Sequence, residues 1–259
     1  MSLQGVIKAG VLIGNVALLT GGYVLVKMLY NNYLNYKKES KRLEKGGQSN
    51  YQYLVDAFNQ EGKVGELVKI NNLSFIGTSE PVAPTTFVHS KINNIEKYIC
   101  IKGVLHEYNK DIIQTQWIKA FNLKDENNHQ VTILVNNKES FMPQLFKRVS
   151  EPKDDQKEGQ LVKEAFSVKV TESGIAFGSN LYVFGSFIKN KLGQIQCVES
   201  KLICNASDAK SQTQIQSYIF WVGAACVVTC CLLISGITLY LTFSDSDEKK
   251  NKQERAIRR

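Results

Sequence analysis

The sequence predicts an α+β protein in which two transmembrane helices flank a mainly β domain, a small barrel or sandwich with short helices. Tyr218–Phe243 is a long apolar run that holds no charged residue, and Ala9–Val26 is a second apolar run between Lys8 and Lys27. The stretch between them contains about seven short segments with strand patterns, separated by turn residues. We therefore expect a first transmembrane helix with a basic stalk over 6–45, a soluble domain over 46–215, a second transmembrane helix over 216–243 and a charged tail over 244–259.

The second apolar run is long enough to cross a bilayer. At about 1.5 Å per residue, Tyr218–Phe243 spans the ~30 Å hydrocarbon core with some tilt. Tyr218 and Trp221 lie at one end and Tyr240 at the other, where aromatic rings favour the two interfaces. The alternative is a buried core helix, which seldom stays uncharged over such a length.

The first apolar run fits either a secretory signal peptide or a retained anchor. A basic residue precedes it, but it is long for a signal peptide and no A-x-A-like cleavage site follows, so the pattern favours an anchor. Two spans make a hairpin that places both termini on one side of the membrane. Gly10 and Gly14 have the GxxxG spacing that permits close helix packing, and the amide of Asn15 can hydrogen-bond to a neighbouring helix.

The positive charge of the chain is concentrated beside the spans. The net charge is +8, yet residues 46–215 carry 19 Lys and Arg against 18 Asp and Glu. The excess therefore lies in the tail Lys249–Arg259 and in the stalk, at Lys37, Lys38, Lys41, Arg42 and Lys45. This placement favours anionic lipids such as cardiolipin, or a partner subunit, and argues against nucleic acid. Basic residues flank the spans on both sides, so the positive-inside rule gives no orientation.

Helical patterning continues beyond the first span through Tyr30, Tyr33, Leu34 and Leu43, and Gly46-Gly47 predicts its end. Further helices are expected over Tyr51–Asn59, capped by Asn50 with Tyr53, Leu54 and Phe58 inward, and over Phe141–Val149. Strands are expected over Glu66–Ile76, Tyr98–His106, Gln114–Leu123, Val131–Val135, Phe166–Val170, Leu181–Ile188 and Gln194–Cys197. A loop is expected at Pro81 and Pro84, a solvated segment over Pro152–Gly159, and a hairpin turn over Asn190–Gly193. The predicted barrel core contains Trp117, Phe121, Val131, Ile133, Leu181 and Val183.

Two stretches of the middle domain carry a family resemblance. Lys119–Asn136 reads as a strand, an acidic turn and an alternating strand, and Glu172–Cys197 contains the pattern G-x-x-L-x-V-x-G. With the flanking spans, the region 65–198 resembles the GIDE/BAM domain, which lies between the two membrane spans of ubiquitin ligases of mitochondria and the chloroplast envelope. Those ligases carry a RING after the second span. The tail after Phe243 holds no Cys or His, so we expect no RING here, and no catalytic residue is implied by the resemblance.

The sequence shows no pattern of an enzyme site. His89, His106 and His129 are isolated, and no GxSxG, P-loop or Rossmann motif is present. Three cysteines lie in the second span, and the domain holds Cys100, Cys197 and Cys204, without CxxC spacing. We therefore expect no catalytic residue, metal or cofactor, and we leave open whether Cys197 and Cys204 are bridged. Asn72 and Asn205 begin glycosylation sequons, which matter only in a secretory lumen.

Two functions follow from these patterns. In the first, the protein is a non-catalytic accessory subunit of a large mitochondrial membrane complex, of the inner membrane and the respiratory chain. The organelle is implied by the resemblance, and the inner membrane is chosen because the largest assemblies reside there. In the second, it is a RING-less relative of the ligases that binds clients or acts as an adaptor in the outer membrane.

Overall fold

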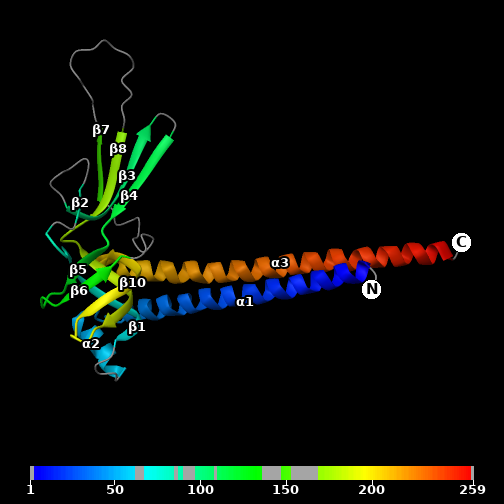
Figure 1. Cartoon of the computed structure of the whole chain (residues 1–259), viewed down its shortest axis with the longest axis horizontal. Helices are drawn as coiled ribbons and strands as arrows, with labels where there is room; N and C mark the ends of the chain where they lie inside the picture. The colour runs from blue at the N-terminus through cyan, green and yellow to red at the C-terminus, as the bar shows by residue number, and fades with distance from the viewer. Residues whose placement is uncertain are drawn as a thin grey trace, which may run out of the picture. The chain divides into compact units, whose positions relative to one another are not determined.

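The computed structural model describes residues 3–61, 67–84, 87–89, 97–107, 110–135, 147–152 and 169–257. The predicted α+β class is confirmed, because two long apolar helices, α1 (Leu3–Glu44) and α3 (Ala209–Ile257), flank a sheet-rich domain (Figure 1). The chain divides into two compact units. One unit contains α1 and α3, and the other is the domain Lys45–Lys210.

The ends of the helices agree with local sequence signals. α1 ends at Glu44, and Gly46 then takes a positive φ of 73°, as the Gly46-Gly47 stop signal predicts. A 3-10 turn, η3 (Ala206–Asp208), leads directly into α3. Both helices are longer than the apolar runs that predicted them, because the flanking residues contain few helix-breaking residues.

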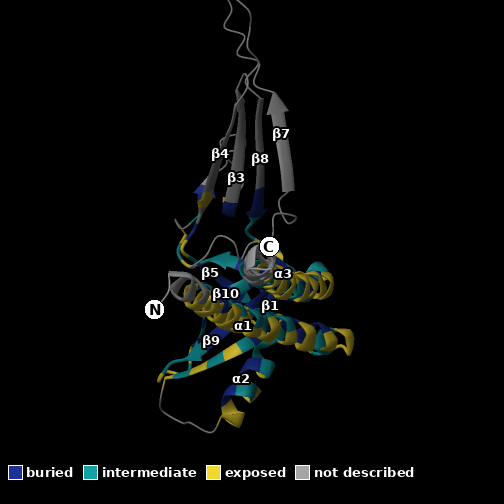
Figure 2. Cartoon of the chain, turned by 90° about the vertical axis from the view of Figure 1, so that its right-hand side faces the viewer, coloured by how far each residue is buried: buried dark blue, intermediate teal, exposed yellow. Residues whose placement is uncertain are grey.

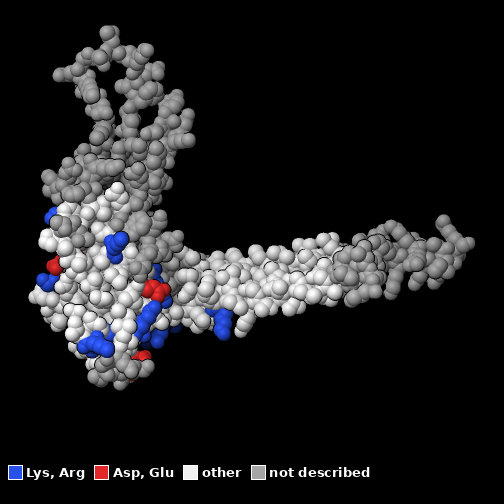
Figure 3. Space-filling view, in the orientation of Figure 1, with Lys and Arg blue, Asp and Glu red and all other residues white. Residues whose placement is uncertain are grey.

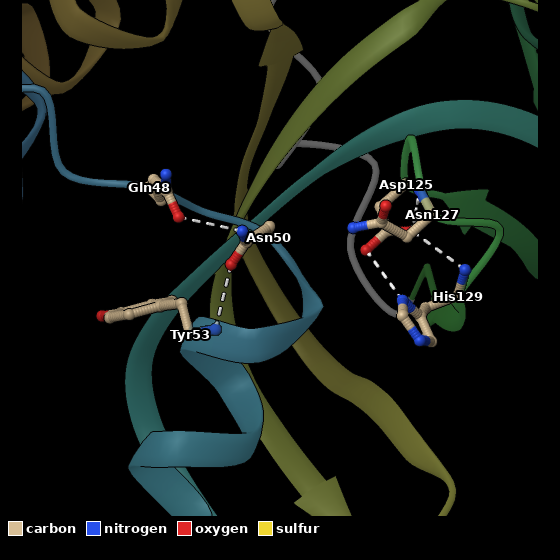
Figure 4. Close-up of polar contacts among 6 residues, drawn as sticks. All are labelled: Gln48, Asn50, Tyr53, Asp125, Asn127 and His129. Carbon is tan, nitrogen blue, oxygen red and sulfur yellow. Dashed lines mark hydrogen bonds and ion pairs between the residues drawn. The ribbon is translucent and has the colours of Figure 1, made fainter.

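The short helix α2 (Tyr51–Gln60) forms where it was predicted. The side chain of Asn50 accepts a hydrogen bond from the backbone N–H of Tyr53 at 3.0 Å, which satisfies one of the unpaired donors of the first turn (Figure 4). Leu54 and Phe58 are buried as expected, whereas Tyr53 is only half-buried. Together these contacts position α2 at the start of the domain.

Five strands of the domain close into a barrel in the order β1-β5-β6-β10-β9. Neighbours are antiparallel, except that β6 and β10 are parallel. Counted along the chain within the barrel, the order is one, two, three, five, four, with the third and fifth strands parallel, which is the strand arrangement of an OB-fold. The barrel strands are β1 (Val68–Pro81), β5 (Ala120–Lys124), β6 (Gln130–Leu134), β9 (Asn180–Lys189) and β10 (Ile195–Asn205).

A second antiparallel sheet is built from two insertions into the barrel. Its order is β2-β3-β8-β7, with β4 also paired to β3. The first insertion follows β1 and supplies three strands, and the second follows β6 and supplies two. These strands are β2 (Val88–His89), β3 (Lys97–Glu107), β4 (Lys110–Trp117), β7 (Lys147–Pro152) and β8 (Lys169–Ala176).

The barrel interior forms the main core of the domain (Figure 2). Five of the six predicted core residues are fully buried, namely Phe121, Val131, Ile133, Leu181 and Val183. The placement of Trp117 in the barrel is wrong, because it ends β4 and pairs with Cys100 in the second sheet. The clean alternation of Val131, Ile133 and Val135 is confirmed, since all three are buried.

Several predicted elements require correction. The single strand over Gln114–Leu123 is two strands, because the chain leaves the second sheet after Trp117 and enters the barrel at Ala120. The loop expected at Pro81 begins later, since β1 runs through Pro81 at its end, where a missing N–H is tolerated. The helix expected over Phe141–Val149 is wrong for Lys147–Val149, which belong to β7. The rest of that segment, most of Pro152–Gly159 and residues 166–168 lie outside the described residues.

The barrel contains a close backbone approach at Gly185. A Cβ placed there would lie 2.1 Å from the carbonyl oxygen of Glu199, inside the region where β10 shifts register against β9. Only glycine fits this position, because β9 and the irregular part of β10 approach so closely here. The predicted hairpin turn is confirmed, since Gly193 has a φ of 80° and Asn190 Oδ1 accepts from the N–H groups of Leu192 and Gln194.

Candidate functional site: a helix hairpin suited to a membrane

α1 and α3 pair in an antiparallel manner along their length. Asn15 contacts Thr238 near one end of the pair, and Glu44 contacts Gln214 near the other. Between them, a Cβ placed at Gly22 would meet the sulfur of Cys231. Because residue numbers rise along α1 as they fall along α3, these contacts define one continuous hairpin.

Many residues of the two helices are exposed (Figure 2), and the exposed residues include large apolar ones along both helices. Ala9–Glu44 and Ala206–Thr242 are long and apolar enough to cross a membrane, and at most 11% of each apolar window is buried. Ile13 is 70% exposed and Leu241 is 61% exposed. Soluble proteins rarely present so large a contiguous apolar surface to water. The buried-core alternative for Tyr218–Phe243 is therefore wrong, and the chain is consistent with a two-pass membrane protein.

Asn15 makes a polar contact between the helices inside the apolar region. Its Oδ1 accepts a hydrogen bond from Thr238 Oγ1 at 3.0 Å, and its Nδ2 donates to the Val11 carbonyl at 3.0 Å. Asn15 is only 8% exposed. A buried amide in hydrocarbon is costly without partners, so both ends of the Asn15 side chain are satisfied here. Asn15 therefore forms a hydrogen bond between the two helices of the hairpin itself.

The small-residue contact between α1 and α3 lies elsewhere than the GxxxG motif. A Cβ added at Gly10 or Gly14 would meet nothing within 4 Å, so these glycines do not pack against α3. The glycine that does so is Gly22, where an added Cβ would lie 2.5 Å from Cys231 Sγ. Sequence reasoning missed Gly22, because the pair Gly21-Gly22 has no further glycine at GxxxG spacing. The open face at Gly10 and Gly14 remains available to another helix.

Aromatic rings pair across the hairpin beyond the first apolar run. The rings of Tyr33 and Trp221 lie 6.5 Å apart between centroids, and those of Tyr36 and Phe220 stack at 5.5 Å. Pairs of this geometry add stabilisation beyond their buried area. They also place Tyr33 of α1 and Trp221 of α3 at the same level along the hairpin axis.

The predicted basic flank divides into exposed and paired residues. Lys37, Lys38 and Lys41 are exposed along α1, and Lys45 is exposed just after the helix ends. Arg42 instead binds Glu39 in a bidentate manner, with Nη2 and Nε at 2.6 and 2.8 Å from the two carboxylate oxygens. Lys37 Nζ lies 4.9 Å from the centre of the Tyr33 ring. The exposed lysines can therefore bind an external anion, whereas Arg42 is neutralised within the helix.

A cluster of charged and polar side chains on the barrel stabilises β1 and β10 where their pairing is irregular, and we assign it no catalytic role. Glu199 Oε2 accepts from Lys69 Nζ at 3.3 Å and from Ser186 Oγ at 3.1 Å, and these bonds lower the pKa of the Glu199 carboxyl below its usual value. Asn72 has a φ of 62° where β1 shifts register, and its Oδ1 accepts from Lys201 Nζ at 3.0 Å. The hydrogen bond from Lys201 supports Asn72 in the left-handed conformation, which asparagine adopts more readily than most other non-glycine residues.

His129 belongs to the β5–β6 turn. Its Nδ1 lies 3.3 Å from Asp125 Oδ2, and Asp125 Oδ1 accepts from the N–H groups of Asn127 and His129 (Figure 4). The imidazole also stacks on the ring of Tyr51 at 4.6 Å between centroids. These contacts tie the turn to α2, and they explain His129 without a metal.

The thiols of the domain are buried and unbridged. Cys100, Cys197 and Cys204 are free, which settles the question of a Cys197–Cys204 disulfide. Burial raises the pKa of each of these thiols to about 12, so the reactive thiolate is scarce at neutral pH. Among the described residues, no group of three or more His, Cys, Asp or Glu is placed to hold a metal ion.

Comparison with protein-family models, with curated proteins and with solved structures found no significant match. The functional assignment therefore depends on the geometry of the hairpin and the domain.

Proposed function

We propose that this chain is a non-catalytic accessory subunit of a larger membrane complex, anchored by the α1–α3 hairpin. The observation that carries the proposal is the pairing of two apolar helices through Asn15 and Thr238, with apolar side chains turned outward. Because α1 is held against α3, it behaves as a retained anchor rather than as a signal peptide that would be removed. The domain Lys45–Lys210 is then presented in water beside the membrane.

The open face of α1 supports membership in a complex. Gly10 and Gly14 have no neighbour within 4 Å of an added Cβ, so a helix from another subunit can approach their backbone closely. Asn15 lies beside this face but is satisfied within the chain, so we assign the subunit contact to the glycines and the hairpin contact to Asn15.

We place the complex in a mitochondrial membrane, and in the inner membrane in preference to the outer. The organelle derives from the resemblance of residues 65–198 to the GIDE/BAM domain, and the inner membrane from the concentration of large respiratory assemblies there. The exposed stalk lysines suit the anionic lipids of that membrane, including cardiolipin.

The barrel does not alter this assignment. OB-folds often bind nucleic acids, but a fold does not determine a function. The balance of 19 basic and 18 acidic residues across 46–215 gives the domain no general attraction to phosphate backbones. Neither the ion pair of Glu199 with Lys69 nor the buried domain cysteines form a pair of nucleophile and base.

The alternative is an adaptor that binds clients through its domain in the outer membrane, without stable partners. The GIDE/BAM resemblance favours it, since that domain is associated with binding. The two functions differ in the size of the native assembly, because a subunit migrates with its complex whereas an adaptor migrates as a small species.

The test is native gel electrophoresis of a mild-detergent membrane extract. The unaltered chain is expected to migrate with a complex far larger than its 29.1 kDa. The double variant Gly10→Leu and Gly14→Leu is expected to leave the complex yet remain membrane-inserted. Gly21→Leu combined with Gly236→Leu is the matched control, because it adds the same two side chains at glycines that are open in the hairpin. Migration of the unaltered chain as a monomer would refute the subunit proposal in favour of the adaptor.

A further inference from the structure

One side of α1 beyond the first apolar run carries exposed basic and aromatic residues in a helical repeat. We define the basic–aromatic face as Lys27, Tyr30, Lys37, Lys38 and Lys41. All five are exposed, and Leu34 between them is exposed as well. Steps of three and four residues connect Lys27, Tyr30, Leu34, Lys37 or Lys38, and Lys41, so they occupy one stripe of the helix.

Most of this stripe is turned away from α3. Leu29 contacts Gly223 of α3, and Tyr36, seven residues later, stacks on Phe220. Lys27 precedes Leu29 by two residues, a rotation of about 200° around the helix axis. Lys38 follows Tyr36 by the same two residues, so Lys27 and Lys38 lie on the far side of α1 from α3. Lys37, one turn after Tyr33, lies at the flank of α1, and its side chain is exposed, so a ligand outside the hairpin can reach it as well.

The charge of this region is positive and confined to α1. The two acids of the same segment are engaged elsewhere, Glu39 by Arg42 and Glu44 by Gln214. α3 has no charged residue from Ser211 to Phe243. Figure 3 shows basic side chains on the hairpin within a largely uncharged surface. The side of the hairpin formed by α1 therefore attracts anions, and the side formed by α3 does not.

The aromatic residues place these lysines at the height of lipid headgroups. Tyr30, Tyr218 and Trp221 are all more than half exposed, and such rings favour the membrane–water interface. Tyr33 packs on Trp221 at that height. At 1.5 Å per residue, Lys37 lies about 6 Å beyond Tyr33 and Lys41 about 12 Å beyond it, whereas Lys27 lies about 9 Å on the apolar side. The long stem of Lys27 can extend its ammonium group outward to the interface.

We infer that the basic–aromatic face binds the phosphate groups of anionic phospholipids, with Lys37, Lys38 and Lys41 as the phosphate ligands and Tyr30 against the glycerol region. This inference deepens the proposed function, on which it rests for the membrane insertion of the hairpin. Lysine ammonium groups pair with phosphodiester oxygens, and the ring of Tyr33 holds Lys37 Nζ toward one place. Lipid is favoured over an acidic protein segment, because interfacial rings flank the lysines at headgroup height.

The test compares lipid selectivity in vesicles that contain the full chain. The chain is reconstituted in phosphatidylcholine vesicles with spin-labelled phosphatidylglycerol or spin-labelled phosphatidylcholine, and the motionally restricted fraction of each probe is measured. The unaltered chain is expected to prefer phosphatidylglycerol. The triple variant Lys37→Gln, Lys38→Gln and Lys41→Gln is expected to lose at least the roughly fivefold preference that one interfacial lysine supplies.

Two controls separate charge position from total charge and from folding. Lys119→Gln, Lys189→Gln and Lys191→Gln remove the same charge from the domain and are expected to leave the preference unchanged. Replacing Lys37, Lys38 and Lys41 by Arg keeps the charge and is expected to keep the preference. Raising the ionic strength should weaken the preference of the unaltered chain.

The outcomes distinguish this inference from the proposed function. Equal restriction of both lipids around the unaltered chain would overturn the lipid inference, whether or not the native complex is intact. Loss of the complex by the Gln variant with unchanged lipid preference would show that the face binds a protein, and would also overturn it. A monomeric native species with a clear phosphatidylglycerol preference would support the inference and refute only the subunit proposal.

Discussion

Truncation of Phe121 should destabilise the domain by several kcal/mol. Phe121 is completely buried in β5, between its register partners Pro81 of β1 and Ile133 of β6. Replacing a fully buried Phe by Ala typically costs about 3–5 kcal/mol through lost burial and the cavity that remains. For a domain the size of Lys45–Lys210, each kcal/mol lowers the melting temperature by about 2–4 °C, so we expect a decrease of roughly 6–20 °C.

The buried thiols provide the assay. Cys197 and Cys204 are inaccessible in the fold and become reactive when the barrel opens, so pulsed thiol labelling of the full chain against temperature reports domain unfolding. The cysteines of α3 are replaced by Ala so that the domain alone is read. Leu192→Ala is the control, since Leu192 is 83% exposed and its truncation should cost less than about 0.5 kcal/mol. A loss below about 1 kcal/mol for Phe121→Ala would refute the barrel packing.

Three further predictions concern the barrel approach, the helix contact and pH. Gly185→Ala should destabilise the domain by about 1–3 kcal/mol or more, because its methyl group would collide with the Glu199 carbonyl; thermal unfolding unchanged from the unaltered chain would contradict this. The contact between Asn15 and Thr238 can be tested by a double-mutant cycle of Asn15→Leu and Thr238→Val, measured as dissociation of the two helices in bilayers. We expect a coupling energy of about 0.6 kcal/mol and no more than about 1.7 kcal/mol, because the Thr238 hydroxyl also contacts carbonyls of its own helix. A coupling energy of zero would exclude the hydrogen bond. The Cys197 thiol has an ordinary pKa of 9.0 that the fold raises to about 12, so its contribution to domain stability is complete below pH 9 and is lost as pH rises toward 12. Denaturant titrations should therefore show that the free energy of unfolding decreases more between pH 8 and pH 11 for the unaltered chain than for Cys197→Ala. Equal decreases for the two chains would contradict a raised pKa of the Cys197 thiol.

Local patterns in the sequence were sufficient for α1, α2 and α3 and for most barrel strands. Uncharged length identified Tyr218–Phe243, a glycine pair marked the end of α1, and strict alternation placed Val131 and Ile133 in the core. These signals are local, because a helix end or a half-buried strand is specified by its own residues.

Long-range organisation could not be predicted in the same way. The stretch from Trp117 to Phe121 is apolar except for Lys119, so periodicity does not reveal that the chain changes sheets within it. The change depends on hydrogen bonds to distant residues, such as Ile118 N–H to the Ile99 carbonyl and Val135 N–H to the Lys119 carbonyl. The double insertion that builds the second sheet has no sequence signature of its own.

The candidate site was predicted in part. The amide of Asn15 stood out because a polar side chain in an apolar run requires a partner, and the structure supplies Thr238. The composition of the sequence revealed the basic flank. It did not reveal which basic residues are exposed and which are paired, because the ion pair of Arg42 with Glu39 depends on side-chain geometry. The side of α1 that faces α3 also escaped prediction, because both sides of the helix are apolar in the first span.

The most direct test of the account is the membrane topology of the hairpin. A protease site inserted at the exposed turn after Leu192 reports the domain, and a second site appended after Arg259 reports the tail. Sealed membrane vesicles of each orientation are treated with the protease, before and after permeabilisation. Two spans predict that the domain site and the tail site are cut from opposite faces. Cleavage of both sites from the same face of sealed vesicles would contradict the two-pass hairpin.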